Sequence, residues 1–144
     1  MDDEANKQLT KPFQVRWNES LGKPECPYLR RWVFIFFGFS IRLHHWISSD
    51  DQRYFHDHPW NFISIIFKGS YKNVTPTGTV EFKAPAMWKS DGMKQHYVVV
   101  PPSGAWTLLL CSRPYRKWGF WVNGKLWRPL RYFSKFGPHN KLCE

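Results

Sequence analysis

The sequence predicts an all-β fold made of one domain, either a sandwich or a barrel. Eleven prolines and nine glycines are spread along the 144 residues, so the chain is interrupted at short intervals. The segments between these breaks are rich in aromatic and β-branched residues, as β-strands are. No long segment has the 3.6-residue apolar period of a helix, and the length suits a single domain.

The strands are predicted from alternation and from the turn residues that bound them. Residues 1–28 are mainly polar, so we expect an irregular N-terminal arm containing one strand, Phe13–Trp17. Gly69 is expected to close the strand that begins at Asn61. The other predicted strands are Leu29–Phe37, Ser40–Ser48, Asn61–Lys68, Tyr71–Thr75, Thr79–Lys83, Gln95–Val100, Ala105–Cys111, Lys117–Val122 and Lys125–Trp127.

Three connections between these strands carry turn signals. Residues 76–78 (Pro-Thr-Gly) and 101–104 (Pro-Pro-Ser-Gly) are typical of tight turns, and Asn123-Gly124 is the strongest short hairpin signal in the chain. We therefore predict a β-domain over residues 29–128, followed by a basic C-terminal tail over residues 129–144.

The segment Ser40–Ser48 alternates and so presents two faces. Ile41, Leu43, His45 and Ile47 share one face, which we expect to be the core face with His45 as a hydrogen-bonded core residue. His44 shares the other face with Arg42, where it would line a pocket or supply a ligand.

The segment His56-Asp57-His58 has the spacing of a metal site. Two histidines separated by one residue point to the same side of an extended chain, so both imidazoles can reach one ion. Imidazole suits Fe, Zn, Cu or Ni. Asp57 would then point away from the ion and accept a hydrogen bond or pair with an arginine. The alternative is a pair of histidines on a surface loop.

The order of motifs resembles that of the cupin superfamily. The HxH pair is followed by a strand ending at Gly69 and later by the turn Pro102-Ser103-Gly104. The pattern departs from the family at two positions: Asn61-Phe62 stand where a carboxylate ligand would be, and Thr107 stands where a histidine is expected. The resemblance covers roughly residues 40–122. It implies a small cupin-like β-barrel, a jelly roll, with a metal ion inside.

Within this resemblance, His96 is the nearest replacement for the third ligand, although it could instead be a hydrogen-bonded strand residue. A site made of His56, His58 and His96 is similar to that of the thiol-dioxygenase branch, represented by cysteine dioxygenase. That similarity implies one divalent ion, Fe(II) before Zn, Ni or Mn. The chain also looks like small cupin-like proteins of bacteria and phages.

The site suggests an Fe(II) oxygenase-like enzyme acting on a small anionic or thiol substrate. His44 and Tyr97 are candidates for proton relay. The candidates for binding an anionic substrate through a guanidinium fork are Arg42, Arg53 and Arg116. A Zn or Mn hydrolase or isomerase stays open, as does metal-free isomerase chemistry. The main alternative is a binding module without turnover for a nucleotide, sugar or nucleic acid.

The chain is basic, with 21 Lys and Arg against 11 Asp and Glu, a net charge of +10. This charge favours an anionic partner, nucleic acid included, or simply a solvated face, since no nucleic-acid motif accompanies it. The longest apolar run, Trp32–Phe39, is far below the ~20 residues that span a bilayer. With no secretory signal and only three cysteines, we expect a cytoplasmic protein, and its high aromatic content makes a homodimer plausible.

Overall fold

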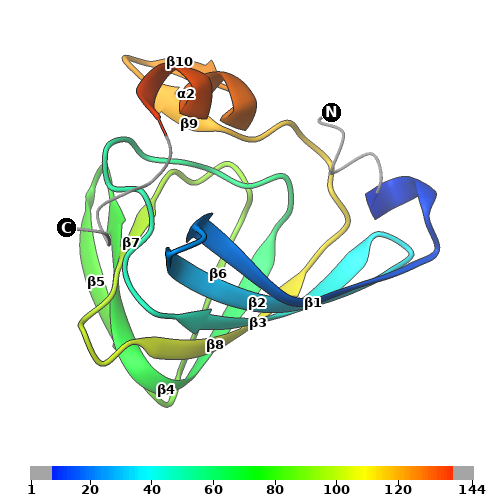
Figure 1. The fold of residues 1–144 in the computed structure, drawn as a ribbon, viewed down its shortest axis with the longest axis horizontal. Helices are drawn as coiled ribbons and strands as arrows, with labels where there is room; N and C mark the ends of the chain where they lie inside the picture. Colours follow the sequence, from blue (N-terminus) through cyan, green and yellow to red (C-terminus); the bar gives the residue numbers. More distant parts are fainter. Residues whose placement is uncertain (1–7, 138–144) are drawn as a thin grey trace.

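The computed structural model describes residues 8–137, which are dominated by antiparallel strands (Figure 1). Residues 1–7 of the predicted arm and 138–144 of the predicted tail lie outside this range. The all-β prediction is confirmed. The elements are β1 (Phe13–Lys23), β2 (Cys26–Phe36), β3 (Phe39–Trp46), β4 (Phe62–Thr75), β5 (Gly78–Lys83), β6 (Ala86–Ser90), β7 (Tyr97–Val99), β8 (Ala105–Cys111), β9 (Phe120–Val122), β10 (Lys125–Trp127) and α2 (Pro129–Phe136).

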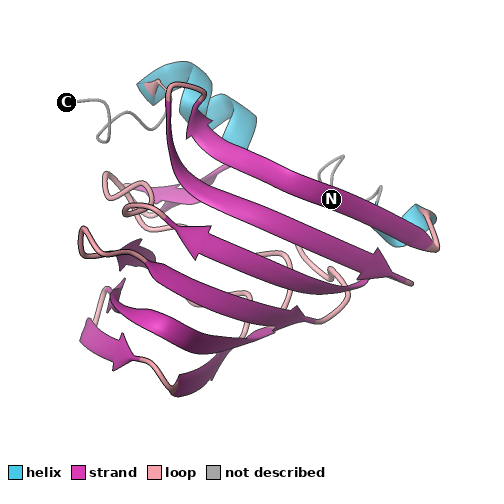
Figure 2. Ribbon diagram, turned by 60° about the horizontal axis from the view of Figure 1, so that its bottom comes forward, coloured by secondary structure: helices cyan, strands magenta, loops and turns pink. Residues whose placement is uncertain are grey.

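Eight strands form one large curled sheet, which Figure 2 shows with its strands side by side. Its order is β1-β2-β3-β8-β4-β5, and β6 and β7 also pair with β4. The strands β9 and β10 form a separate ribbon. Among the described residues no pairing joins β1 to the far end of the sheet, so the ladder is open. The prediction of a closed barrel is corrected in this respect.

Strand β4 is the longest element because Gly69 does not end it, contrary to the prediction. The first half of β4 pairs with β8 and β6, and the second half pairs with β5 and β7. At the junction Gly69 has φ +79°, next to a register shift, and an added Cβ would lie 2.3 Å from the carbonyl oxygen of Gly104. Glycine therefore bends the strand and lets it pass from one set of partners to the other.

The N-terminal segment is more ordered than predicted. β1 runs to Lys23 and forms a long antiparallel hairpin with β2, which crosses the predicted boundary at residue 29. The second half of β1 is polar, so it lacks the apolar alternation from which strands were predicted. Asn18 at φ +49° marks a bulge there, and the Glu19 carboxylate pairs with Arg31 of the neighbouring strand. The described part of the predicted irregular arm is therefore a sheet edge.

The C-terminal end of the described chain contains a hairpin and a helix. β9 and β10 pair around Asn123-Gly124, as predicted, and both turn residues have positive φ. The first eight residues of the predicted tail instead form α2, which begins at Pro129, a favoured first helical residue. Its buried Tyr132 stacks on Phe120 with ring centroids 3.8 Å apart. Figure 1 shows this unit beside the open end of the curled sheet.

Polar and apolar side chains are distributed in an unusual way between the two faces of β3. On β3 the buried side chains are Ser40, Arg42, His44 and Trp46, so the polar face points inward. His45 lies on the outer face and stacks on Trp106, which corrects the expectation that it is a core histidine. The outer face is apolar across five paired strands, in the row Val15, Phe34, Ile41, Leu110 and Ile63.

No helix in the described part of the chain combines the length and the hydropathy needed to span a lipid bilayer.

The bend at Gly69 gives a test of the fold. Gly69→Ala adds a methyl group against the Gly104 carbonyl, whereas Gly124→Ala has an almost equal φ of +77° and no neighbour within 4 Å. Both variants bear the left-handed strain of about 1–2 kcal/mol, and Gly69→Ala adds about 1–3 kcal/mol of steric overlap. The free energy of unfolding measured in urea should therefore be clearly lower for Gly69→Ala than for Gly124→Ala. Equal values would contradict the close approach of Gly69 to the Gly104 carbonyl.

Candidate metal centre

The loop between β3 and β4 carries two of the predicted ligands and is fixed by backbone hydrogen bonds. His56 exchanges N–H···O bonds with His96 of 3.0 and 2.9 Å, which forms an isolated antiparallel bridge just before β7. The His58 N–H donates to Gly92 O at 2.9 Å. His96 was expected as the third ligand, and this bridge places it opposite His56.

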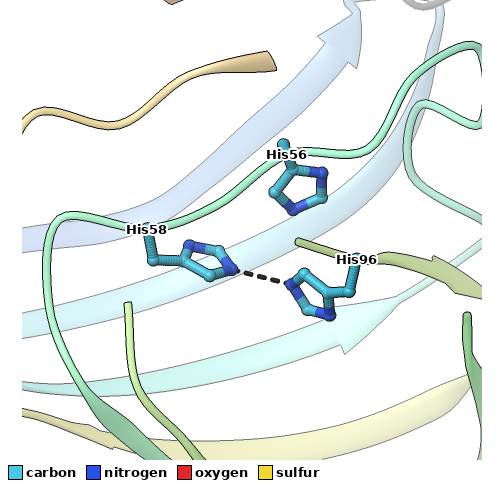
Figure 3. A group of neighbouring side chains, drawn as sticks. All are labelled: His56, His58 and His96. Atoms are coloured by element: carbon cyan, nitrogen blue, oxygen red, sulfur yellow. Dashed lines mark hydrogen bonds between the residues drawn. The ribbon is translucent and has the colours of Figure 1, made fainter. Parts of the chain in front are cut away.

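The three imidazoles converge on one point (Figure 3). One ring nitrogen from each of His56, His58 and His96 lies within 4.8 Å of the others, and the Nε2 atoms of His58 and His96 are 2.8 Å apart. Nitrogen ligands at about 2.0–2.1 Å from an ion lie roughly 3–4 Å from one another, so small side-chain shifts complete a coordination shell. The predicted three-histidine group is therefore able to hold a metal ion.

A hydrogen bond orients His96 for this role. The Asn73 side-chain oxygen lies 2.6 Å from His96 Nδ1 and accepts a hydrogen bond from the N–H at that nitrogen. This fixes the tautomer and leaves the Nε2 lone pair facing His58. Asn73 was not predicted, because its position in the middle of β4 carries no sequence signal for contact with a residue 23 positions later.

Burial keeps the three rings neutral. It lowers the pKa of His56 to about 4 and lowers the pKa values of His58 and His96 well below 6.5. The pKa of His58 is lowered further by the proximity of the other two rings. Neutral imidazole is the form that binds metal ions, so the site is ready to accept one at neutral pH.

Asp57 holds the loop that carries the ligands. Its side chain is fully buried and points away from the three rings, as predicted. The carboxylate accepts hydrogen bonds from the Gly119 N–H and the Trp121 indole, each 2.9 Å long, and pairs with Arg116 at 2.9 Å. Arg116 also donates to the carbonyls of His58 and Gly92. This arrangement favours a structural role for Arg116 instead of the predicted substrate contact.

Asp50 is a carboxylate near the site that was not among the predicted site residues. Its Oδ1 accepts the Val98 N–H at 2.8 Å, and its Oδ2 lies 3.7 Å from His56 Nε2. Burial raises the pKa of this carboxyl group well above its usual value. Asp50 precedes the HxH pair, whereas the carboxylate sought by resemblance would follow it, and this order explains why it was missed. Of the three rings it contacts His56 alone, and the group of ring nitrogens that could hold an ion does not include it.

The three histidines open onto an interior cavity of about 350 Å³. Arg42 and His44 line the same cavity, and the Arg42 guanidinium lies 4.8 Å from the centroid of the Trp60 ring. The Trp60 ring in turn stacks on His58, 4.8 Å between centroids. Two of the predicted site residues outside the metal group are therefore close to it.

Arg53 and Tyr97 do not line this cavity. The Arg53 guanidinium binds the Asp51 carboxylate and donates to the carbonyls of Phe136 and Gly137, which ties the end of α2 to the loop. Tyr97 stacks on Phe55, 5.1 Å between centroids. These contacts favour structural roles for both residues instead of the predicted substrate binding by Arg53 and proton relay by Tyr97.

No family model matches the sequence, and no curated protein matches it. Solved structures do match the fold. An RmlC-like cupin from Shewanella frigidimarina NCIMB 400 superposes with a TM-score of 0.54 at 12% identity, over 74% of this chain and 96% of that one. The fold is that of a cupin.

Two further structures support the cupin fold. KdgF from Halomonas sp. has a TM-score of 0.50 at 12% identity, over 72% of this chain and 89% of that one. FeII HppE has a TM-score of 0.54 at 7% identity, over 72% of this chain but only 59% of its own length. Identities this low establish the fold alone, and the activity of this chain has to be argued from its own site.

The lowered histidine pKa values predict a pH dependence of stability for the metal-free protein. With an ordinary pKa of 6.5 and a folded pKa of about 4, His56 stays neutral when the unfolded chain is protonated. Its contribution to stability is complete above pH 6.5 and is lost as the pH falls toward 4, about 2 kcal/mol by pH 5.

Urea unfolding of chelator-treated protein between pH 7.5 and pH 5 measures this loss. His56→Gln should reduce the slope, whereas His45→Gln on the outer face should change it little. An unchanged slope in His56→Gln would show that this ring is not buried in its neutral form.

Proposed function

We propose that this protein is a mononuclear metal-dependent enzyme, an Fe(II) oxygenase-like cupin acting on a small anionic or thiol substrate. The observation that carries the proposal is the convergence of three imidazole nitrogens within 4.8 Å at the wall of an interior cavity. Three neutral ligands leave the ion its full charge and open coordination positions, which favours binding of an anion or thiolate. Zn, Ni and Mn are the alternative ions for the same ligand set.

The chain's own residues would bind and orient the substrate. Arg42 is 3% exposed and lines the cavity near the metal group, so its guanidinium supplies positive charge where solvent does not screen it. His44 lies two residues from Arg42 on the same face of β3 and is the candidate for moving a proton. The aromatic wall formed by Trp60 and Phe62 excludes water from the reacting atoms.

The alternative proposal is a binding module without turnover. The net charge of +10 favours it, since a basic surface attracts a nucleotide or nucleic acid. Nucleic-acid binding predicts an affinity that falls steeply with salt, and a flat salt dependence would argue against it. The cytoplasmic location stays a prediction.

Metal content separates the two proposals. Protein purified without oxygen and reconstituted with Fe(II) should hold one ion per chain by elemental analysis. His58→Ala and His96→Ala should each weaken binding by more than ~100-fold, since even loss of an indirect partner of a ligand costs about 10–100-fold. His45→Ala removes an outer-face imidazole and should bind normally.

Full metal occupancy in His96→Ala would contradict the ligand assignment. Failure of the wild-type protein to bind any divalent ion would leave the binding module as the better proposal.

We also propose that two copies pair through the apolar outer face of the sheet. The row across β1, β2, β3, β8 and β4 consists of apolar side chains that are 38–52% exposed, and neighbouring exposed apolar side chains of this kind favour a protein–protein interface. A two-fold axis would bring the same face of a second copy against it.

A charge in the middle of this face tests the pairing. Ile41→Lys should convert a dimer to a monomer, measured by light scattering after size-exclusion chromatography, because two lysines would be buried at the interface. Val80→Lys is the control, since Val80 is also exposed but lies on β5, outside the row. A wild-type monomer at 100 μM would refute the pairing.

A further inference from the structure

Two buried polar side chains face each other on neighbouring strands in the cavity wall. His44 of β3 pairs in register with Thr107 of β8, and directly opposed residues have Cβ atoms about 4.5–5.5 Å apart. The two residues are 7% and 0% exposed, and both line the cavity that the metal group opens onto. They form a polar patch on an inner face that otherwise carries many apolar residues.

Both residues lack hydrogen-bond partners within the described structure. Nδ1 and Nε2 of His44 and Oγ1 of Thr107 are buried without one. Other buried hydroxyls of the same cavity are satisfied: Ser64 and Tyr71 share a hydrogen bond of 3.2 Å, and the Trp88 indole donates to Tyr71. A buried polar group left without a partner costs about 1–3 kcal/mol, so these unpaired atoms indicate a ligand that satisfies them.

Positive charge flanks this patch. Arg31 lies opposite His44 on β2, Arg42 lies two residues away on the same face of β3, and both line the cavity. Arg31 pairs with Glu19, and Arg42 donates to Ser40 and Gln8. Burial, followed by the two arginines, lowers the pKa of His44 well below 6.5. His44 is therefore neutral, with one nitrogen that donates and one that accepts.

The donors and acceptors of the patch specify two chemical groups in the ligand. The guanidinium of Arg42 only donates, so a ligand group that faces it has to be an acceptor, and a carboxylate adds favourable charge. The accepting nitrogen of His44 and the oxygen of Thr107 need a donor, which an ionised carboxylate lacks. A hydroxyl both donates and accepts, and so it satisfies an imidazole and a threonine together.

We propose that the cavity binds a small hydroxy acid, with its carboxylate toward Arg42 and a neighbouring hydroxyl between His44 and Thr107. This inference rests on the proposed function, because it takes the ligand to be the substrate of the same site. A cavity of about 350 Å³ accommodates a chain of about six carbons.

Matched probes test the class of ligand. The full chain is titrated calorimetrically with three six-carbon probes: D-gluconate carries a carboxylate and hydroxyls, hexanoate carries the carboxylate alone, and sorbitol carries hydroxyls alone. Lactate and propionate repeat the comparison of a hydroxy acid with its deoxy partner on a shorter chain. At least one hydroxy acid should bind tenfold or more tightly than its deoxy partner, and sorbitol should bind weakly. Equal affinity within both acid pairs, or no binding by either hydroxy acid at 10 mM, would overturn the proposal.

Substitutions locate the effect. Thr107→Val keeps the shape, removes the hydroxyl and should reduce the preference for the hydroxy acid by about tenfold, while Thr79→Val on the exposed surface of β5 should not change it. His44→Gln keeps a donor and an acceptor and should retain more of the preference than His44→Leu. Without ligand, Thr107→Val should be as stable as the wild type, because its hydroxyl has no partner to lose. A destabilised Thr107→Val with an unchanged preference would mean that the hydroxyl has a structural role only.

The metal experiment separates this inference from the proposed function. The titrations are run on metal-loaded and chelator-treated protein, since the patch belongs to the chain and its preference should persist without metal. Protein that binds no metal yet prefers hydroxy acids would refute the enzyme and support the ligand class. Protein that binds metal but does not distinguish each acid from its deoxy partner would refute the ligand class alone.

Discussion

The buried carboxylate of Asp57 is the contact on which the geometry of the site depends. Asp57 lies between the two histidines of the HxH pair, and its side chain points the opposite way. Its carboxylate accepts hydrogen bonds from the Gly119 amide and the Trp121 indole and forms an ion pair with the Arg116 guanidinium. These bonds fasten the loop between β3 and β4 to the segment that leads into β9. An extended chain held on one side presents its alternate side chains on the other, so His56 and His58 are aimed into the cavity together. The bridge to His96 adds the third ring.

On β3 the polar side chains of Ser40, Arg42 and His44 lie inside and the apolar side chain of Ile41 lies outside, the reverse of what a small domain ordinarily shows. The inward face of β3 carries arginine and histidine at the wall of a cavity, where groups that are costly to bury lie as the proposed ligand site requires. The outer face is then left with apolar side chains that a second copy would cover. Binding site and interface would thus be opposite surfaces of the same strands.

The scaffold is shared with cupins of very different sequence, and the site differs in its details. Thr107 stands where the resemblance would place a histidine, and the nearby carboxylate comes from Asp50, upstream of the HxH pair. Since a fold of this kind supports several chemistries, the residues of the cavity wall would decide which substrate the proposed enzyme accepts.

The sequence by itself determined that the protein is an all-β domain, where most of its strands and its Asn-Gly turn lie, and that His56 and His58 point to one side of the chain, where both can reach one ion. These follow from local rules: alternation, turn residues and the two-residue period of a strand. His96 was named through the resemblance to cupins. Only the tertiary structure decided which face of β3 is inside, because alternation defines two faces and does not say which one encloses the cavity. It also gave Arg53 and Arg116 their protein partners, extended β1 through a polar segment, and brought Asp50 and Asn73 to the histidines. Such contacts join residues far apart in the chain, and no local pattern encodes them.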